Sequence, residues 1–193
     1  MDILLAITGA SGSIYGLRLA EELAKRQIPL GLVLSEQGAA VMQYETGVTM
    51  DQPFASALAN QYNTTVVLHD NHNLWATAAS GSAGPSHMVI APCSMGTLGR
   101  ISHGVSSTLI ERAADVMLKE RKPLIMVPRE TPLSAIHLQN MLALHQAGAD
   151  ILPACPGFYQ KPTSFEALVD FVVSKVLDRL VIPNNLVSRW QGR

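Results

Sequence analysis

The sequence predicts a doubly wound α/β sandwich, in which a mostly parallel sheet is flanked by helices. Short apolar runs alternate with amphipathic helical patterns along the 193-residue chain. Strands joined by helical crossovers lie parallel in a sheet that is covered on both faces. In addition, most of the apolar runs end in hydroxyl, glycine or charged residues. The length favours one domain over residues 1–193, with an irregular tail from about residue 183.

The first expected strand, Ile3–Ile7, leads through the loop 8–13 into a helical pattern over Ser13–Arg26. Glycines allow close approach of a ligand, and serine hydroxyls beside a helix N-terminus attract anions, so the loop is interpreted as a phosphate cradle. Its glycines are Gly9, Gly12 and Gly16. This spacing matches neither the dinucleotide fingerprint nor the P-loop, which favours a mononucleotide or another phosphate ester. An ordinary tight turn is the alternative.

The rest of the chain alternates in the same way. Further strands are expected at Ile28–Leu34, Val66–Leu68, Met88–Ala91, Leu124–Val127 and Ile151–Leu152. Further helices are expected around Ala39–Tyr44 and Phe54–Gln61, from near Ser107 to Met117, from Ile136 to Leu144, and over Phe165–Leu180. The segment 78–85, rich in glycine and serine, is expected to be a mobile loop, and the segment 92–97 a turn that closes the strand before it.

Polar side chains follow nearly every expected strand: Ser11, Ser35, Ser94, Thr97, Arg129, Glu130 and Tyr159. Ligands of doubly wound sheets bind at this edge, so these residues are expected to converge on one site. Arg129 and Glu130 lie between prolines, which hold the backbone, so that the arginine could bind a phosphate and the glutamate could move a proton. A surface ion pair is the alternative.

The composition limits the kinds of molecule that the protein is expected to bind. The formal net charge is −1, without a basic run, which argues against binding of nucleic acid or a membrane surface. The N-terminal apolar run has strand length and lacks a basic segment before it, so we expect neither a signal peptide nor a membrane span, and a cytoplasmic protein. Only 15% of the residues are charged and 48% are hydrophobic, which predicts that subunit interfaces bury part of the surface.

Other reactive side chains favour structural interpretations. His69 and His72 lie three residues apart without a third ligand nearby in sequence, so no metal site is expected. Cys93 and Cys155 are expected to be reduced and buried, with a nucleophilic thiol as the alternative. One charged run is expected to form a solvated helix face. It comprises Glu111, Arg112, Asp115, Lys119, Glu120, Arg121 and Lys122.

Six motifs in order give the chain a family resemblance. They are Thr8-Gly9-Ala10-Ser11-Gly12, Pro92-Cys93-Ser94, Glu111-Arg112-Ala113-Ala114-Asp115-Val116, Leu118-Lys119-Glu120-Arg121, Val127-Pro128-Arg129-Glu130 and Pro156-Gly157-Phe158-Tyr159. On these motifs the chain resembles the UbiX family of flavin prenyltransferases from Ile3 to about Trp190. The resemblance implies a Rossmann-like flavoprotein, usually a dodecamer, with a place in ubiquinone biosynthesis. It implies transfer of a dimethylallyl group from dimethylallyl phosphate to N5 and C6 of reduced FMN, and delivery of the prenylated FMN to a UbiD-type decarboxylase.

The resemblance also implies site residues. FMN is expected to contact Gly9, Ala10, Ser11, Ser35, Ser94, Met95, Gly96, Thr97 and Arg129. Dimethylallyl phosphate is expected to contact Tyr159 and Lys175, the latter in a position where close relatives carry arginine. Catalytic roles fall on Ser11, Glu130, Arg112 and Lys119. No metal is implied, because fixed cations and hydroxyl donors can stabilise a leaving phosphate. Trp75 and the flavin ring could provide the aromatic faces that attract an allyl cation.

Two other functions stay open. A flavin-dependent cysteine decarboxylase would need a catalytic histidine near the first helix, and Ser13–Arg26 contains none. A non-enzymatic FMN-binding accessory subunit of a decarboxylase would keep the FMN loops and would need neither Tyr159, Lys175 nor Glu130.

Overall fold

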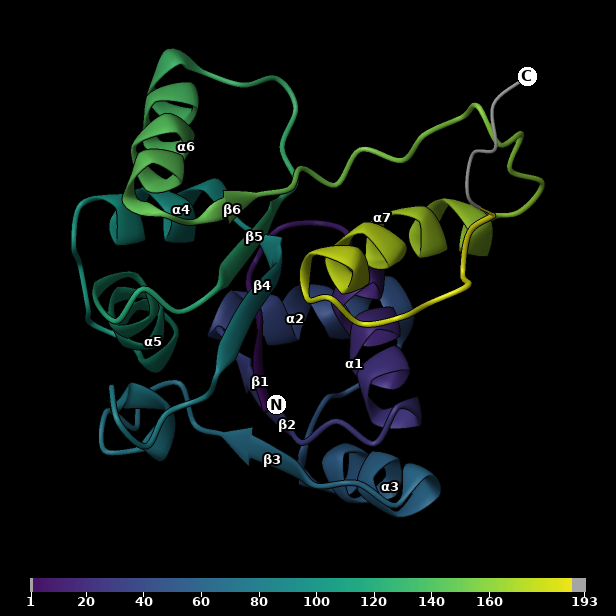
Figure 1. Ribbon diagram of the computed structural model, residues 1–193, viewed down its shortest axis with the longest axis horizontal. Coiled ribbons are helices and arrows are strands. Elements are labelled where there is room, and N and C mark those ends of the chain that lie inside the picture. Colours follow the sequence, from purple (N-terminus) through teal and green to yellow (C-terminus); the bar gives the residue numbers. More distant parts are fainter. Residues whose placement is uncertain (1, 189–193) are drawn as a thin grey trace.

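The chain forms a six-stranded sheet with helices on both faces, as Figure 1 shows for a computed structural model that describes residues 2–188. The strand order is β3-β2-β1-β4-β5-β6, and each neighbouring pair is parallel. This is the order of a Rossmann fold. The prediction of a doubly wound, Rossmann-like α/β sandwich is confirmed.

The strands lie at most of the expected places: β1 (Ile3–Ile7), β2 (Leu30–Leu34), β3 (Val66–His69), β4 (His87–Cys93), β5 (Leu124–Pro128) and β6 (Asp150–Ile151). The helices are α1 (Ser13–Lys25), α2 (Glu36–Thr46), α3 (Gln52–Tyr62), α4 (Met95–Ser102), α5 (Leu109–Lys119), α6 (Ala135–Ala147) and α7 (Phe165–Arg179). Residues 183–188 contain neither helix nor strand, as expected of the tail. The end of the family resemblance, near Trp190, lies outside the described residues.

Alternate side chains of β1 divide the core into two layers. Ile3, Leu5 and Ile7 pack against α1 and α7, whereas Leu4 and Ala6 pack against α4 and α5. Figure 1 shows the corresponding layers, with α4, α5 and α6 on one side of the sheet and α1, α3 and α7 on the other. Because a strand that is buried on both faces needs apolar side chains in both directions, β1 is a continuous apolar run.

Helix α4 differs from the expectation that the segment 92–97 is a turn. Its sequence contains two glycines, which disfavour helix formation in isolation. Two features offset this: the Ser94 hydroxyl accepts a hydrogen bond from the N–H of Thr97 at 3.2 Å, and Leu98 and Ile101 are buried in the core. Pro92 and Cys93 belong to β4 rather than to the turn. Tertiary packing therefore determines that this segment is a helix.

The expected mobile loop 78–85 begins inside a 3₁₀ turn, Thr77–Ala79, whose Ala78 is buried. The Lys122 ammonium donates to the carbonyl oxygens of Gly81 at 2.9 Å and Pro85 at 3.3 Å. These contacts fix parts of the segment, and its mobility stays a prediction. Among the described residues, no helix is long and apolar enough to span a membrane.

Candidate active site

The point where the strand order reverses lies between β1 and β4, and Thr8 joins the ends of these two strands. Its hydroxyl donates to the Pro92 carbonyl oxygen at 2.9 Å and accepts from the N–H of Ser94 at 2.7 Å. Thr8 is completely buried. It therefore fixes the loop after β1 against the start of α4, at the edge where doubly wound sheets bind ligands.

One cavity of about 310 Å³ opens at this edge. Among its lining residues are four of the expected FMN contacts, namely Gly9, Ser35, Ser94 and Thr97. Ser35 and Ser94 cap α2 and α4, and the Ser35 hydroxyl accepts from the N–H of Gly38 at 3.0 Å. Two helix N-termini therefore face one cavity, which favours a negatively charged ligand.

A second cavity of about 500 Å³ has the loop 9–12 as a common wall with the first and is lined by Ser11 and Arg129. The Arg129 side chain donates through Nε to the backbone oxygen of Ser11 at 2.9 Å, which ties the loop after β5 to the loop after β1. Apolar side chains form much of the remaining lining: Ile14, Tyr15, Leu17, Ala154 and Phe165. This cavity suits a ring system better than a phosphate.

Glu45, in the last turn of α2, occupies the N-terminus of α1. Its carboxylate accepts from the backbone N–H groups of Gly12 at 3.0 Å and Ser13 at 2.9 Å. Burial alone would raise the pKa of Glu45, but these bonds and one from the Ser11 hydroxyl lower it below its usual range. The interpretation of the α1 N-terminus as a free phosphate cradle is therefore wrong for this structure, because a carboxylate already binds there.

Two glycines explain why the first loop can be so tight. Gly12, the residue before α1, has φ of 103°, a conformation that side chains with a Cβ rarely adopt. A Cβ on Gly16 would lie 2.4 Å from the Ala91 carbonyl oxygen, so only glycine lets α1 pack this closely on β4. The spacing of these glycines reflects packing of α1 on the sheet as well as access for a ligand.

A third cavity, of about 290 Å³, contains both residues expected to bind the prenyl phosphate, Tyr159 and Lys175. Phe171 connects them: its ring centroid lies 5.9 Å from that of Tyr159, edge to face, and 5.6 Å from the Lys175 ammonium. Asp178 competes for the same ammonium at 3.9 Å. Sequence reasoning did not select Phe171, although its spacing of four residues from Lys175 on a helix indicates that the two can touch.

The other residues expected at the site differ in what they can offer. Met95 is buried in the core, so its side chain faces away from solvent, and Ala10 is buried too. Glu130 is exposed, and its carboxylate accepts from the N–H of Thr131 at 2.9 Å. Trp75 is 97% exposed, so within one chain it encloses no ligand.

The two thiols differ from each other. Cys93 is buried, as expected, and burial raises the pKa of its thiol to about 12, which makes it inert as a nucleophile at neutral pH. Cys155 is exposed, so the expectation of burial is wrong for it. It lies in the loop after β6, where the backbone N–H of Ala154 donates to the Pro128 oxygen. Within residues 2–188 no group of three or more histidine, cysteine or carboxylate side chains could hold a metal ion.

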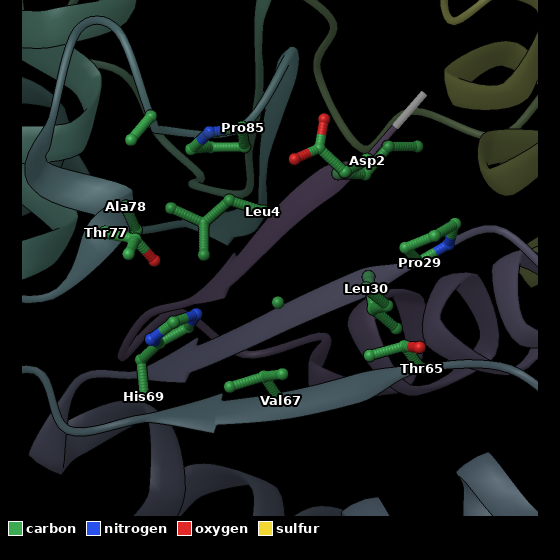
Figure 2. Close-up of a pocket in the computed structure, with 13 residues that line it drawn as sticks. Asp2, Leu4, Pro29, Leu30, Thr65, Val67, His69, Thr77, Ala78 and Pro85 are labelled. Carbon is green, nitrogen blue, oxygen red and sulfur yellow. The ribbon is translucent and has the colours of Figure 1, made fainter.

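A different cavity, of about 190 Å³, lies on the face of β1, β2 and β3 and is shown in Figure 2. Leu4, Val67 and His69 line it, and a Cβ on Gly31 would lie 3.1 Å from both the His69 ring and Leu4. Burial lowers the pKa of His69, so its imidazole is neutral at pH 7. All the expected site residues lie elsewhere in the described part of the chain.

Comparison with known proteins now defines the family. A sequence model of the family named Flavoprotein matches residues 1–177. The flavin prenyltransferase UbiX of Pseudomonas aeruginosa is 46% identical over 194 residues, which cover 97% of this chain and 93% of that protein. The flavin prenyltransferase UbiX of Methanothermobacter thermautotrophicus is 44% identical over 192 residues, which cover 99% of this chain and 96% of that protein. The chain belongs to the UbiX family of flavin prenyltransferases.

Solved UbiX structures share the fold closely. A crystal structure of AnUbiX in complex with FMN and dimethylallyl pyrophosphate has a TM-score of 0.91, 38% identity, and coverage of 100% of this chain and 98% of that one. A dodecameric FMN-dependent UbiX-like decarboxylase from Escherichia coli has a TM-score of 0.90, 37% identity and full coverage of both chains. An FMN-dependent cysteine decarboxylase, TvaF, reaches a TM-score of 0.61 at 16% identity, which shows a common fold alone.

The UbiX motif on α5 contains the two cations that lie apart from the three cavities. Arg112 pairs with Asp115 at 2.9 Å on a half-exposed face. Lys119 pairs with Glu120, and a Cβ on Gly81 would come within 3.2 Å of its ammonium. Because the loop at Gly81 leads into the amino end of β4, Lys119 lies at the edge of the sheet opposite to the two cavities that contain Ser11 and Ser35.

Glu111, on the same motif, corrects the expectation of a solvated charged face. Its side chain is 2% exposed, and it accepts from Arg100 and from the N–H groups of Ser107 at 2.8 Å and Thr108 at 3.2 Å. Burial would raise its pKa, but these donors lower it. The glutamate three residues after Thr108 forms a capping box, a pattern that the sequence does contain and that could have identified it.

Proposed function

We propose that this chain is a flavin prenyltransferase that transfers a dimethylallyl group from dimethylallyl phosphate to reduced FMN without a metal ion. One observation supports the proposal above the others: in a chain 46% identical to a flavin prenyltransferase, six of the nine expected FMN contacts line two cavities at one edge of the sheet. Reduced FMN, when bound, supplies the nucleophilic ring atoms. The protein supplies binding, orientation and proton transfer.

The residue roles follow from position and chemistry. Ser35, Ser94 and Thr97 offer hydroxyls and helix N-termini to the cofactor, and Arg129 braces the Ser11 loop. The Ser11 hydroxyl lies near the Glu45 carboxylate, which can exchange a proton with it. Exposed Glu130, held by the N–H of Thr131, is a candidate proton acceptor for the last step.

The leaving phosphate needs positive charge that is fixed before the reaction. Lys175 and Tyr159 form a cavity that can take it. The structure of AnUbiX contains the pyrophosphate of the same prenyl group, so the number of phosphates is a specific question for this chain. We infer that a single lysine, paired with Asp178, suits the smaller charge of a monophosphate better.

We further propose that Arg112 and Lys119 act from a neighbouring copy of the chain. Helix α5 is about 15 Å long, from its eleven residues. Lys119 lies at its far end, so this cation is too distant from the two cavities of its own chain that contain the expected FMN contacts. Several apolar side chains are exposed and could form the contact between copies: Tyr44, Trp75, Ile136, Leu142, Phe158 and Val181. The dodecameric relative makes a dodecamer the expected assembly. Cytoplasmic location and delivery of the product to a UbiD-type decarboxylase belong to the same proposal.

Mass spectrometry of the flavin tests the function directly. Protein is incubated anaerobically with reduced FMN and either dimethylallyl phosphate or its pyrophosphate, with and without exhaustive EDTA treatment. We expect a flavin heavier by one dimethylallyl unit, more of it from the monophosphate, and no effect of EDTA.

Unmodified flavin in every reaction, together with tight FMN binding, would favour the accessory subunit instead. Release of carbon dioxide from a cysteine-terminated peptide would favour the cysteine decarboxylase. Activity that is lost in EDTA and returns with magnesium would contradict the proposal that protein cations alone hold the phosphate.

A further inference from the structure

The cavity of about 310 Å³ contains a cation that neither the motifs nor the comparisons assign. Arg100, in the second turn of α4, lines it together with Ser35, Ser94 and Thr97. Its side chain is 51% exposed, so a ligand can reach it. All residues that line this cavity belong to the described part of the chain, and Arg100 alone among them carries a permanent positive charge.

The guanidinium of Arg100 is held in place before any ligand binds. Nε donates to the buried carboxylate of Glu111, and Nη2 donates to the Thr97 hydroxyl at 3.2 Å. Glu111 in turn is fixed by the cap of α5, and the Thr97 hydroxyl oxygen accepts from the Ser94 hydroxyl at 3.0 Å. Such a network removes most of the conformational entropy that a free arginine would lose on binding.

The Nη1 group is left for a ligand. It makes no hydrogen bond to any residue between 2 and 188, and a Cβ placed on Gly96 would lie only 3.5 Å from it. Gly96 therefore leaves open the space over which Nη1 extends, beside the N-terminus of α4. Gly96 and Thr97 are both expected FMN contacts, so this arginine lies within the cofactor's expected footprint.

The electrostatics favour one part of the cofactor. The helices α2, α4 and α5 all begin at residues that line this cavity, namely Ser35, Ser94 and Thr108. Their N-termini attract an anion, whereas Glu36 in the same lining repels one. Arg100 offsets Glu36. The α1 N-terminus is unsuitable for an anion because Glu45 occupies it.

We propose that Arg100 binds the phosphate monoester of FMN and is the residue by which this chain selects FMN over riboflavin. The inference rests on the proposed flavin-binding function and deepens it. Arginine forms two parallel hydrogen bonds with phosphate oxygens, and here Nη1 supplies one charge-assisted donor while the helix N-termini supply others. The larger, apolar second cavity then takes the ring end of the flavin.

Equilibrium titration of the full-length protein with FMN and with riboflavin tests the proposal. Arg100→Ala is expected to weaken FMN binding about tenfold or more, the size of one charge-assisted bond, and to leave riboflavin binding unchanged. Arg100→Lys should lose less, because it keeps the charge without the fixed fork. Arg179→Ala is the matched control, since Arg179 is also a partly exposed arginine paired with a carboxylate, Asp150; it should change neither affinity.

The pattern of affinities separates the possible failures. If the wild-type protein binds neither flavin, the proposed function fails. If it prefers FMN and Arg100→Ala keeps that preference, only the role of Arg100 is overturned. Equal weakening of both flavins would also overturn it, because a fold defect at α4 would act on the whole ligand, and far-UV circular dichroism of each variant would detect that defect.

Discussion

At the scale of single residues, Glu130 is the clearest case in which binding and chemistry should separate. It is exposed, and its carboxylate accepts one backbone hydrogen bond, from Thr131. Glu130→Gln keeps the shape and the accepting oxygen but removes the base. We expect unchanged FMN affinity and a single-turnover rate of flavin modification lowered about 100-fold.

Rapid-mixing single-turnover assays would measure this rate, with Glu166→Gln as the control. Glu166 is another exposed glutamate, in the first turn of α7, and its substitution should leave the rate unchanged. A normal rate in Glu130→Gln would remove Glu130 from proton transfer.

Lys175 tests the site for the prenyl phosphate. Its ammonium lies 5.6 Å from the Phe171 ring centroid and 3.9 Å from an oxygen of Asp178. These contacts hold the ammonium in place and leave it able to bind a phosphate. Lys175→Ala should raise KM for dimethylallyl phosphate about tenfold, the value of one modest charged interaction, and leave FMN affinity unchanged. Lys175→Arg should restore or improve binding, because arginine holds two phosphate oxygens.

Steady-state kinetics at varied prenyl phosphate, with titration of FMN, would measure both effects. An unaltered KM in the alanine variant would show that Lys175 is only a surface residue and that Tyr159 binds the prenyl phosphate without it.

At the scale of elements, the start of α5 depends on Glu111. Its buried carboxylate accepts from two backbone N–H groups and from Arg100, so Glu111→Ala should lower the free energy of unfolding by about 3 kcal/mol, from charged hydrogen bonds and a lost cap. Asp115→Ala, which breaks only the half-exposed pair with Arg112, should cost about 0.5 kcal/mol or less. Urea unfolding at fixed protein concentration would compare the two.

The same carboxylate gives a pH dependence of known sign. The pKa of Glu111 is lowered in the folded chain, so its contribution is fully present above its unfolded value of about 4.5 and is lost as pH falls through the folded value. The stability difference between wild type and Glu111→Gln should therefore be larger at pH 7 than at pH 3. A difference that stays constant with pH would contradict this prediction, because it would show that the pKa of Glu111 is the same in the folded and the unfolded chain.

Local sequence signals predicted the elements well, because β1, β2 and β5 are continuous apolar runs and their ends carry turn residues. These signals failed where contacts with residues distant in the sequence determine the local structure. Helix α4 forms because Leu98 and Ile101 reach a core made elsewhere, and Glu45 reaches the α1 N-terminus from 33 positions away. Arg100 owes part of its defined orientation to Glu111 on another helix.

At the scale of the whole molecule, the family resemblance named residues that one chain does not bring together. The sequence places Lys119 in a site motif, yet the fold puts it beside the Gly81 loop, at the opposite edge of the sheet from Ser11. Sequence pattern carries no information about which copy of a chain supplies a residue. The geometry of one chain does carry this information, because it excludes residues whose side chains cannot reach the site within their own chain.

Mixed oligomers test whether Lys119 acts between copies. Lys119→Ala and Glu130→Gln are each expected to be nearly inactive alone. If the two residues reach one site from different copies, oligomers assembled from both variants contain some sites in which both residues are intact, about a quarter under random mixing in a symmetric assembly.

Co-expression with two affinity tags, followed by tandem purification, would give these oligomers, and flavin mass spectrometry would measure their activity. The control is the double variant co-expressed with Glu130→Gln, in which no site regains Glu130. Activity no higher than in that control would overturn the proposal, because it would mean that no site combines Lys119 of one copy with Glu130 of another.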